Sequence, residues 1–115
     1  MHELSIAQGL FKVILQEAKK NDIGSIARII IRIGEASGIE EGFLRHSFVD
    51  HILPGTIAEK AKVEILPEAL ELKCKDCGKK LKGENKPAMK CCYCGSLNLE
   101  ITGGMNVYVA GIEGE

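Results

Sequence analysis

The chain has 115 residues, of which 45% are hydrophobic and 27% are charged, and its formal net charge is −1. These values are typical of one folded domain with at most a small appendage, and they exclude a disordered chain. The balanced charge gives no overall attraction to nucleic acid. Because no signal peptide or apolar span of roughly 20 residues is evident, we expect a cytoplasmic protein with no membrane partner.

A helix and then a strand are predicted from the first part of the chain. The helix covers about residues 4–20, where apolar residues recur at the spacing of one helix face: Leu4, Ala7, Leu10, Phe11, Ile14, Leu15 and Ala18. In residues 25–38 the period changes to two and β-branched residues dominate, which predicts a strand followed by a turn at 34–38. The buried face of this strand is expected to contain Ala27, Ile29, Ile31 and Ile33.

A second helix is predicted over residues 40–53, closed by Pro54 and Gly55. Its expected buried face consists of Phe43, Leu44, Ser47, Phe48 and Ile52. His46 and Asp50 are four residues apart and are placed to form a surface pair. His46 and His51 are five residues apart, so α-helical spacing places them on different faces.

The rest of the chain predicts four strands around a cysteine-rich stretch. Alternating residues mark strands at 61–66 and 69–73, with a turn at Pro67 between them. Two further strands are predicted at 97–101 and 105–112. The last strand carries enough apolar residues to pair with the sheet of the first part of the chain.

Together these elements predict an α/β (α+β) fold, in which two helices pack on a small mixed sheet and a four-cysteine module is inserted. The expected domains are residues 1–66 plus about 105–115, and the cysteine module of about 67–104. The sequence contains no nucleophile–base pair, phosphate loop or dinucleotide-binding fingerprint. We therefore do not expect an enzyme.

The cysteines form two Cys-x-x-Cys-Gly segments, here called knuckles, which begin at Cys74 and Cys91. Cys74, Cys77, Cys91 and Cys94 supply four sulfurs, and the glycine after each pair lets the backbone turn tightly around them. This ligand set suits Zn²⁺ in a closed structural site, while iron and a redox role stay open as alternatives. A disulfide is a third alternative, which the expected cytoplasmic compartment disfavours. Cys92 would replace Cys91 if the ion shifted by one residue.

The first three residues, Met1, His2 and Glu3, bring an amine, an imidazole and a carboxylate together. A chelate closed by the amine and the next backbone nitrogen, with the His2 imidazole beside it, provides the tetragonal ligand set that Ni²⁺ or Cu²⁺ favours. The alternative is an ordinary chain start, in which Glu3 merely complements the dipole of the first helix.

The chain contains, in order, MHELSIAQGL, IGEASGIEEGFLRHSF and the two Cys-x-x-Cys-Gly knuckles. This combination covers essentially the whole chain and resembles the HypA/HybF family of hydrogenase maturation nickel chaperones. The resemblance implies a nickel-binding α/β domain joined to a zinc-ribbon domain. It also implies Ni(II) as transferred cargo at Met1, His2 and Glu3, and structural Zn(II) at the four knuckle cysteines.

The same resemblance implies two protein partners, a HypB-type GTPase and the precursor of the [NiFe] hydrogenase large subunit. Whether the protein is a monomer or a homodimer is left open. The sequence departs from the family pattern at Cys92, where many relatives have proline.

An alternative of another class is a zinc-ribbon module that binds nucleic acid or a protein and has no nickel role. Five lysines make the cysteine module basic: Lys79, Lys80, Lys82, Lys86 and Lys90. Tyr93 is the only aromatic residue among them, however, and single-stranded nucleic acid is usually bound by several stacking side chains. Nucleic-acid binding is therefore not favoured.

Overall fold

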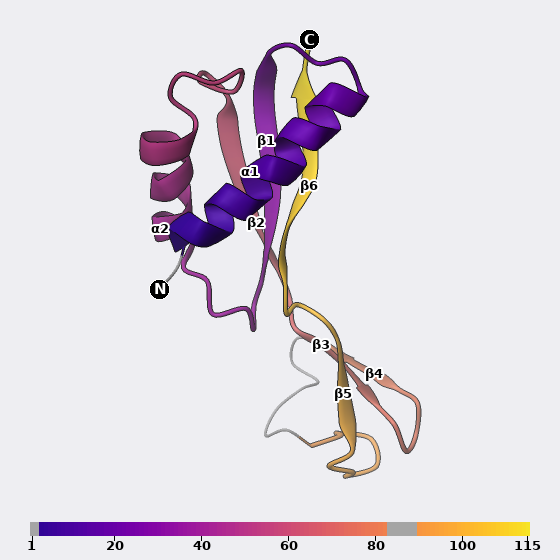
Figure 1. The fold of residues 1–115 in the computed structure, drawn as a ribbon. Coiled ribbons are helices and arrows are strands. Elements are labelled where there is room, and N and C mark those ends of the chain that lie inside the picture. Colours follow the sequence, from indigo (N-terminus) through magenta and orange to yellow (C-terminus); the bar gives the residue numbers. More distant parts are fainter. Residues whose placement is uncertain (1–2, 83–89) are drawn as a thin grey trace. The chain divides into compact units, whose positions relative to one another are not determined.

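A computed structural model describes residues 3–82 and 90–115, and the chain divides into two structural units (Figure 1). The first unit comprises Met1–Ile33, Ile39–Leu66 and Val107–Glu115, and the second comprises Gly34–Gly38 and Pro67–Asn106. None of the helices in the described part of the chain has the length and hydropathy that a bilayer span requires.

The first unit contains a three-stranded sheet in the order β2-β1-β6. Its strands are β1 (Ile26–Gly34), β2 (Lys62–Glu68) and β6 (Val107–Gly114). Strand β6 is antiparallel to β1, which confirms the predicted return of the last strand to this sheet. Backbone hydrogen bonds join Ile26 to Ile57 at the start of β1 and Glu35 to Glu68 just after its end, so β2 runs parallel to β1 and the sheet is mixed.

Two helical segments cover this sheet (Figure 1). Helix α1 spans Glu3–Lys20, as predicted, and packs against β6 and against the second segment. That second segment is α2 (Glu41–His46), which continues directly into a π-helical turn, η1 (Ser47–Ile52). The largest fully buried side chains of the core between helices and sheet are Phe48, Ile14, Ile26, Ile29, Ile31, Leu44 and Leu53.

The buried face of β1 differs from the prediction at its first residues. Ala27, expected in the core, is exposed, and Ile26 is buried in its place. The pairing with β6 is irregular between Ile26 and Arg28, so the strand has a bulge there that reverses the alternation of side chains. From Ile29 onward the alternation follows the sequence pattern.

Pro67 does not form the predicted turn, because β2 continues through it to Glu68. Strand β2 lies at the edge of its sheet, where a residue without an N–H interrupts no ladder hydrogen bond on the solvent side. Residues 69–70 provide the break between β2 and the next strand instead.

The second helical segment changes its hydrogen-bonding pattern after His46. In η1 the Leu53 N–H donates to the Phe48 carbonyl, five residues back, at 2.9 Å. The Ser47 hydroxyl donates to the Phe43 carbonyl at 3.0 Å and so competes with the backbone for an acceptor of the preceding turn. The expected helix is thus present, but its second half is a π-helix, a rare form that occurs mostly as single turns.

The π-helical turn changes which side chains share a surface. The rings of His46 and His51 meet edge to face with their centroids 5.0 Å apart, so the prediction that they lie on different faces was wrong. The predicted pair of His46 and Asp50 is confirmed, with Nδ1 and Oδ2 at 2.5 Å. Phe43, expected on the buried face, lies in α2 before this turn and is 64% exposed.

The second unit is a smaller sheet in the order β4-β3-β5. The central strand β3 (Glu71–Cys74) pairs antiparallel with β4 (Lys80–Lys82) and with β5 (Leu99–Gly103). Its buried cluster consists of Leu72, Cys74, Leu81 and Cys91. A cluster this small provides little hydrophobic stabilisation, and small units of this kind are usually held by a metal or by disulfides.

Replacing Ile31 by Ala is expected to lower the free energy of unfolding by about 2–5 kcal/mol, because it leaves a cavity in the core of the first unit. Urea-induced unfolding followed by circular dichroism measures this cost. Ile57, which is 39% exposed, offers a matched control, and Ile57→Ala should cost about 1 kcal/mol or less. Equal costs for the two variants would contradict the burial of Ile31.

Candidate metal centre

The four cysteines of the two knuckles converge in the second unit. The Sγ atoms of Cys74, Cys77, Cys91 and Cys94 all lie within 4.8 Å of one another. The Sγ atoms of Cys74 and Cys94 are 3.6 Å apart, and those of Cys77 and Cys91 are 3.7 Å apart. Four sulfurs at about 2.3 Å from a central ion would be about 3.8 Å apart in a tetrahedron. The sulfur spacing therefore fits a tetrahedral metal site, and it exceeds the S–S bond length of about 2.05 Å.

Both knuckles have the same backbone conformation. The glycine that ends each one has a positive φ, +76° at Gly78 and +75° at Gly95. Its N–H donates to the carbonyl of the first cysteine of the same knuckle, at 2.8 Å for Cys74 and 2.9 Å for Cys91. Residues with a Cβ are strained at such angles, so the glycines are needed for the tight turn, as the sequence indicated.

Backbone N–H groups point at the first sulfur of each knuckle. The Cys74 sulfur accepts from the Cys77 N–H at 3.5 Å, and this bond is the main reason that the pKa of Cys74 is lowered. The Cys91 sulfur accepts from the N–H groups of Tyr93 and Cys94, each at 3.4 Å. Burial acts to raise the pKa of Cys91, but the Cys94 and Tyr93 amides outweigh it and lower that pKa to about 6.

The pKa of the second cysteine of each knuckle is raised instead. The Ser96 N–H acts to lower the pKa of Cys94, but the neighbouring Cys74 sulfur and burial raise it to about 12. The pKa of Cys77 is also raised, because burial and the sulfurs of Cys74 and Cys91 outweigh the Lys79 N–H. Four thiolates this close therefore repel one another, and a bound cation is what allows all four to ionise.

A polar side chain inside the first knuckle ties it to the second. The Asp76 carboxylate accepts hydrogen bonds from the Ser96 hydroxyl and, at 3.5 Å, from the Asn98 side-chain amide. The sequence prediction missed this link, although a short acidic residue inside one knuckle and a serine directly after the other were a visible signal.

Cys92 lies outside the sulfur cluster and its side chain is exposed. The structure thus brings Cys91, and not Cys92, to the other three sulfurs. Next to it, the Tyr93 ring is covered by the Lys79 ammonium, which lies 5.0 Å from the ring centroid.

The second predicted site, at the start of the chain, is described only in part, because Met1 and His2 lie outside the described residues. Glu3 is the first residue of α1, and its pKa is lowered mainly by a hydrogen bond from its own backbone N–H. The Glu40 N–H contributes to the same shift, so the starts of α1 and α2 lie close together. Glu40 itself caps α2 by accepting from the Phe43 N–H at 2.8 Å.

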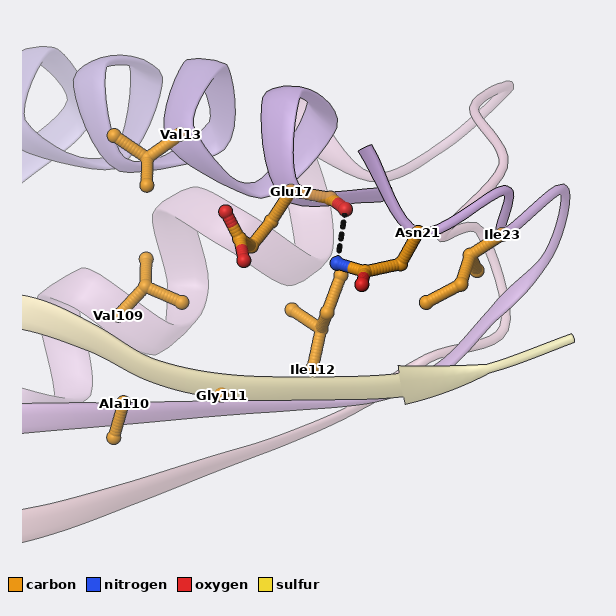
Figure 2. Close-up of a pocket in the computed structure, with 8 residues that line it drawn as sticks. All are labelled: Val13, Glu17, Asn21, Ile23, Val109, Ala110, Gly111 and Ile112. Carbon is orange, nitrogen blue, oxygen red and sulfur yellow. Dashed lines mark hydrogen bonds between the residues drawn. The ribbon is translucent and has the colours of Figure 1, made fainter. Parts of the chain in front are cut away.

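A groove of about 560 Å³ lies between α1 and β6 (Figure 2). It is lined by Val13, Glu17, Asn21, Ile23, Val109, Ala110, Gly111 and Ile112. The Asn21 side-chain amide donates to the backbone carbonyl of Glu17 at 2.8 Å. Glu17 is the single titratable side chain in this lining, so the groove provides no acid–base pair for catalysis.

Comparison with known proteins gives matches over the whole length of the chain. Residues 1–114 match the family described as hydrogenase/urease nickel incorporation, metallochaperone, hypA. The chain is 38% identical over 113 residues to the hydrogenase maturation factor HypA of Aquifex aeolicus, covering 98% of this chain and 96% of that one. It is 30% identical to the hydrogenase/urease maturation factor HypA of Helicobacter pylori, covering 98% and 97% of the two chains. The solution structure of the Ni metallochaperone HypA from Helicobacter pylori superposes with a TM-score of 0.77 at 30% identity, again covering 98% and 97%.

Replacing Cys91 by Ser is expected to remove the metal from the second unit, because its sulfur belongs to the cluster. Cys92→Ser is the matched control and should leave metal content unchanged, since Cys92 lies outside the cluster. Elemental analysis of the two purified variants makes the comparison. Retention of one metal ion by Cys91→Ser together with its loss from Cys92→Ser would reverse the assignment.

The metal should be released as the pH falls, because metal binding requires thiolates and protons compete for the same sulfurs. Because the pKa of Cys91 is lowered to about 6, its sulfur is a thiolate above that pH, and protons compete with the metal for it only at lower pH. The apparent affinity should therefore fall with decreasing pH and fall more steeply below pH of about 6. A chromogenic chelator that competes for the ion measures this dependence, and a pH-independent affinity would contradict it.

Proposed function

This chain belongs to the HypA family of nickel metallochaperones for hydrogenase maturation, and we propose that it carries Ni²⁺ at its amino terminus. The cargo would be delivered to the precursor of the [NiFe] hydrogenase large subunit. Members of the family are metallochaperones, so the protein is a carrier and not an enzyme. The observation that carries the proposal is the match over residues 1–114, which includes the start of the chain.

In this proposal two sites of different ligand chemistry hold two different ions. The cluster of four sulfurs would hold Zn²⁺, because a closed set of thiolates suits a tetrahedral ion that stays in place. The amine of Met1, the backbone nitrogen and imidazole of His2, and the Glu3 carboxylate would hold Ni²⁺ through nitrogen and oxygen. A carrier needs an exchangeable cargo site, and a set of nitrogen and oxygen ligands suits exchange better than four thiolates that close a tetrahedron around their ion.

The described part of the chain supports a role for Glu3. The hydrogen bonds that lower the pKa of Glu3 favour its ionised form, and a carboxylate in this form is an anionic ligand. Its position in the first turn of α1 also favours the negative charge. The assignment of functional domains stays a prediction. Residues 1–66 plus about 105–115 would form the nickel-binding domain, and residues of about 67–104 would form the zinc-binding domain.

Delivery requires partners, and we propose a HypB-type GTPase together with the hydrogenase large-subunit precursor. The Helicobacter pylori relative is named for both hydrogenase and urease maturation. For this chain we propose the hydrogenase, in agreement with the name of the Aquifex aeolicus relative.

A nucleic-acid role for the second unit gains no support from the aromatic residue that the sequence offered for it. One face of the Tyr93 ring is already covered by the Lys79 ammonium, so a base cannot stack on that face without displacing it.

Replacing His2 by Ala is expected to remove the tightest nickel equivalent and to leave zinc content unchanged. The physical reason is that the imidazole belongs to the proposed nickel ligands, whereas zinc is held by sulfur. Calorimetric titration of zinc-loaded protein with one equivalent of Ni²⁺ measures the effect. A titration indistinguishable from that of the parent would refute the proposed nickel site.

Adding one glycine before Met1 should have a similar effect, although His2 and Glu3 are both retained, because it displaces the chelating amine. One glycine added after Glu115 is the matched control and should leave the first nickel equivalent intact. Equal nickel binding by the two extended proteins would show that the amine is not a ligand.

A further inference from the structure

We propose that His46 and His51 form a second, weaker site for a divalent transition-metal ion on the surface of η1, with Asp50 as a positioning residue. The site belongs to the first unit, whereas the four-cysteine cluster belongs to the second. It uses none of the proposed ligands of the amino-terminal nickel site, so it stands independently of that proposal.

The two rings are close and accessible. Their centroids lie 5.0 Å apart and their planes are at 82° to each other. The side chains of His46 and Asp50 are 59% and 53% exposed, and His51 is also exposed. An ion with its own water ligands can therefore reach both imidazoles without any rearrangement of the core.

The separation of the rings matches two imidazoles that share one ion. With metal–nitrogen bonds of about 2.0–2.1 Å, two rings bound at a right or a tetrahedral angle have centroids about 4.5–5.2 Å apart. The observed 5.0 Å falls in this range, so the two rings lie at a separation that one shared ion would give.

Asp50 prepares His46 for this role. The distance of 2.5 Å between Nδ1 and the Asp50 carboxylate places the ring proton on Nδ1, and we assign that tautomer from the contact. In the neutral form of the ring the lone pair is then on Nε2, which is the nitrogen that would bind the ion. A carboxylate that accepts a hydrogen bond from the other nitrogen is the usual companion of a metal-binding histidine, since it fixes the ring and makes it more basic.

The π-helical turn is what makes the site possible. In an α-helix, residues five positions apart are separated by about 140° around the axis, so the two rings would not meet. The i+5 hydrogen bond from Leu53 to Phe48 widens the turn and places His51 beside His46. Single π-helical turns are uncommon and are found frequently at functional sites.

The imidazole ligands determine which divalent ions the site would prefer. Two imidazoles favour Ni²⁺, Cu²⁺ or Zn²⁺ over Mg²⁺ and Ca²⁺, which prefer oxygen. Arg45, the adjacent cation in the sequence, is engaged by Glu41 at 3.4 Å and by the Val63 carbonyl. With two protein ligands and the rest water, we expect an exchangeable ion rather than a permanent one.

Nuclear magnetic resonance of the imidazole groups tests the site directly, because the chain has three histidines and each reports separately. Zinc-loaded protein is titrated with Ni²⁺ alone. After the first equivalent, the signals of His46 and His51 should change together and saturate at one further nickel per chain. The signal of His2 reports the amino-terminal site, so failure of one site is distinguished from failure of the other.

Variants identify the ligands. His51→Ala should weaken the nickel response of His46 by at least about 10-fold, while Asp50→Asn should change the His46 tautomer and weaken binding by about 10-fold or more. Asp50→Glu keeps the carboxylate and should restore most of the nickel affinity. Glu17→Gln removes one negative charge elsewhere in the same unit and serves as the control for the charge change of Asp50→Asn. Zinc content and urea unfolding show whether each variant is folded.

Several results would overturn the site. These are unchanged His46 and His51 signals at saturating Ni²⁺, a full response of His46 in His51→Ala, or the same response to Mg²⁺. The last of these would indicate a general ionic effect and not coordination by nitrogen.

Discussion

The second unit depends on placing four sulfur atoms within 4.8 Å of one another. Backbone N–H groups lower the pKa of the first cysteine of each knuckle, whereas burial and the neighbouring sulfurs raise the pKa of the second. Four thiolates therefore cannot lie this close together unless a cation is bound between them. The apolar cluster around Leu72 and Leu81 is too small to hold such an arrangement alone. An ion at this point therefore supplies folding free energy, which explains why the strands and the knuckles are built around it.

A site of this kind cannot also be the place where cargo is exchanged, because releasing its ion would remove what holds the unit together. Separate ligands are needed for an ion that must leave, and nitrogen and oxygen ligands at a chain terminus or on an exposed helical turn meet that need. The first unit is suited to carry them, because its own core of apolar residues, including Ile14 and Phe48, does not depend on a metal. Under the proposed function, division of the chain into two units would separate stability from exchange.

The sequence was informative where a pattern has a single structural meaning. The apolar spacing before Lys20 located α1, and two Cys-x-x-Cys-Gly segments identified the four clustered sulfurs. It failed where the backbone departs locally from the regular geometry that residue spacing assumes. Three features of this kind are the bulge at Ala27, the π-helical turn at 47–52 and the passage of β2 through Pro67. They depend on hydrogen bonds with distant or competing partners, which residue spacing does not show. The link from Asp76 to Ser96 was missed for a similar reason, since it joins two knuckles that are adjacent only after folding.

The helical segment that contains the π-helical turn has a different role at each of its two ends. At the amino end, Glu40 caps α2 and its N–H lies near the Glu3 carboxylate. At the other end, the wider turn aligns His46 with His51. Widening the helix only after His46 leaves the cap in α-helical geometry and moves only the side chains beyond it. One short helical segment can therefore support a carboxylate of the proposed nickel site and present two imidazoles, with each arrangement set by a different hydrogen-bonding pattern.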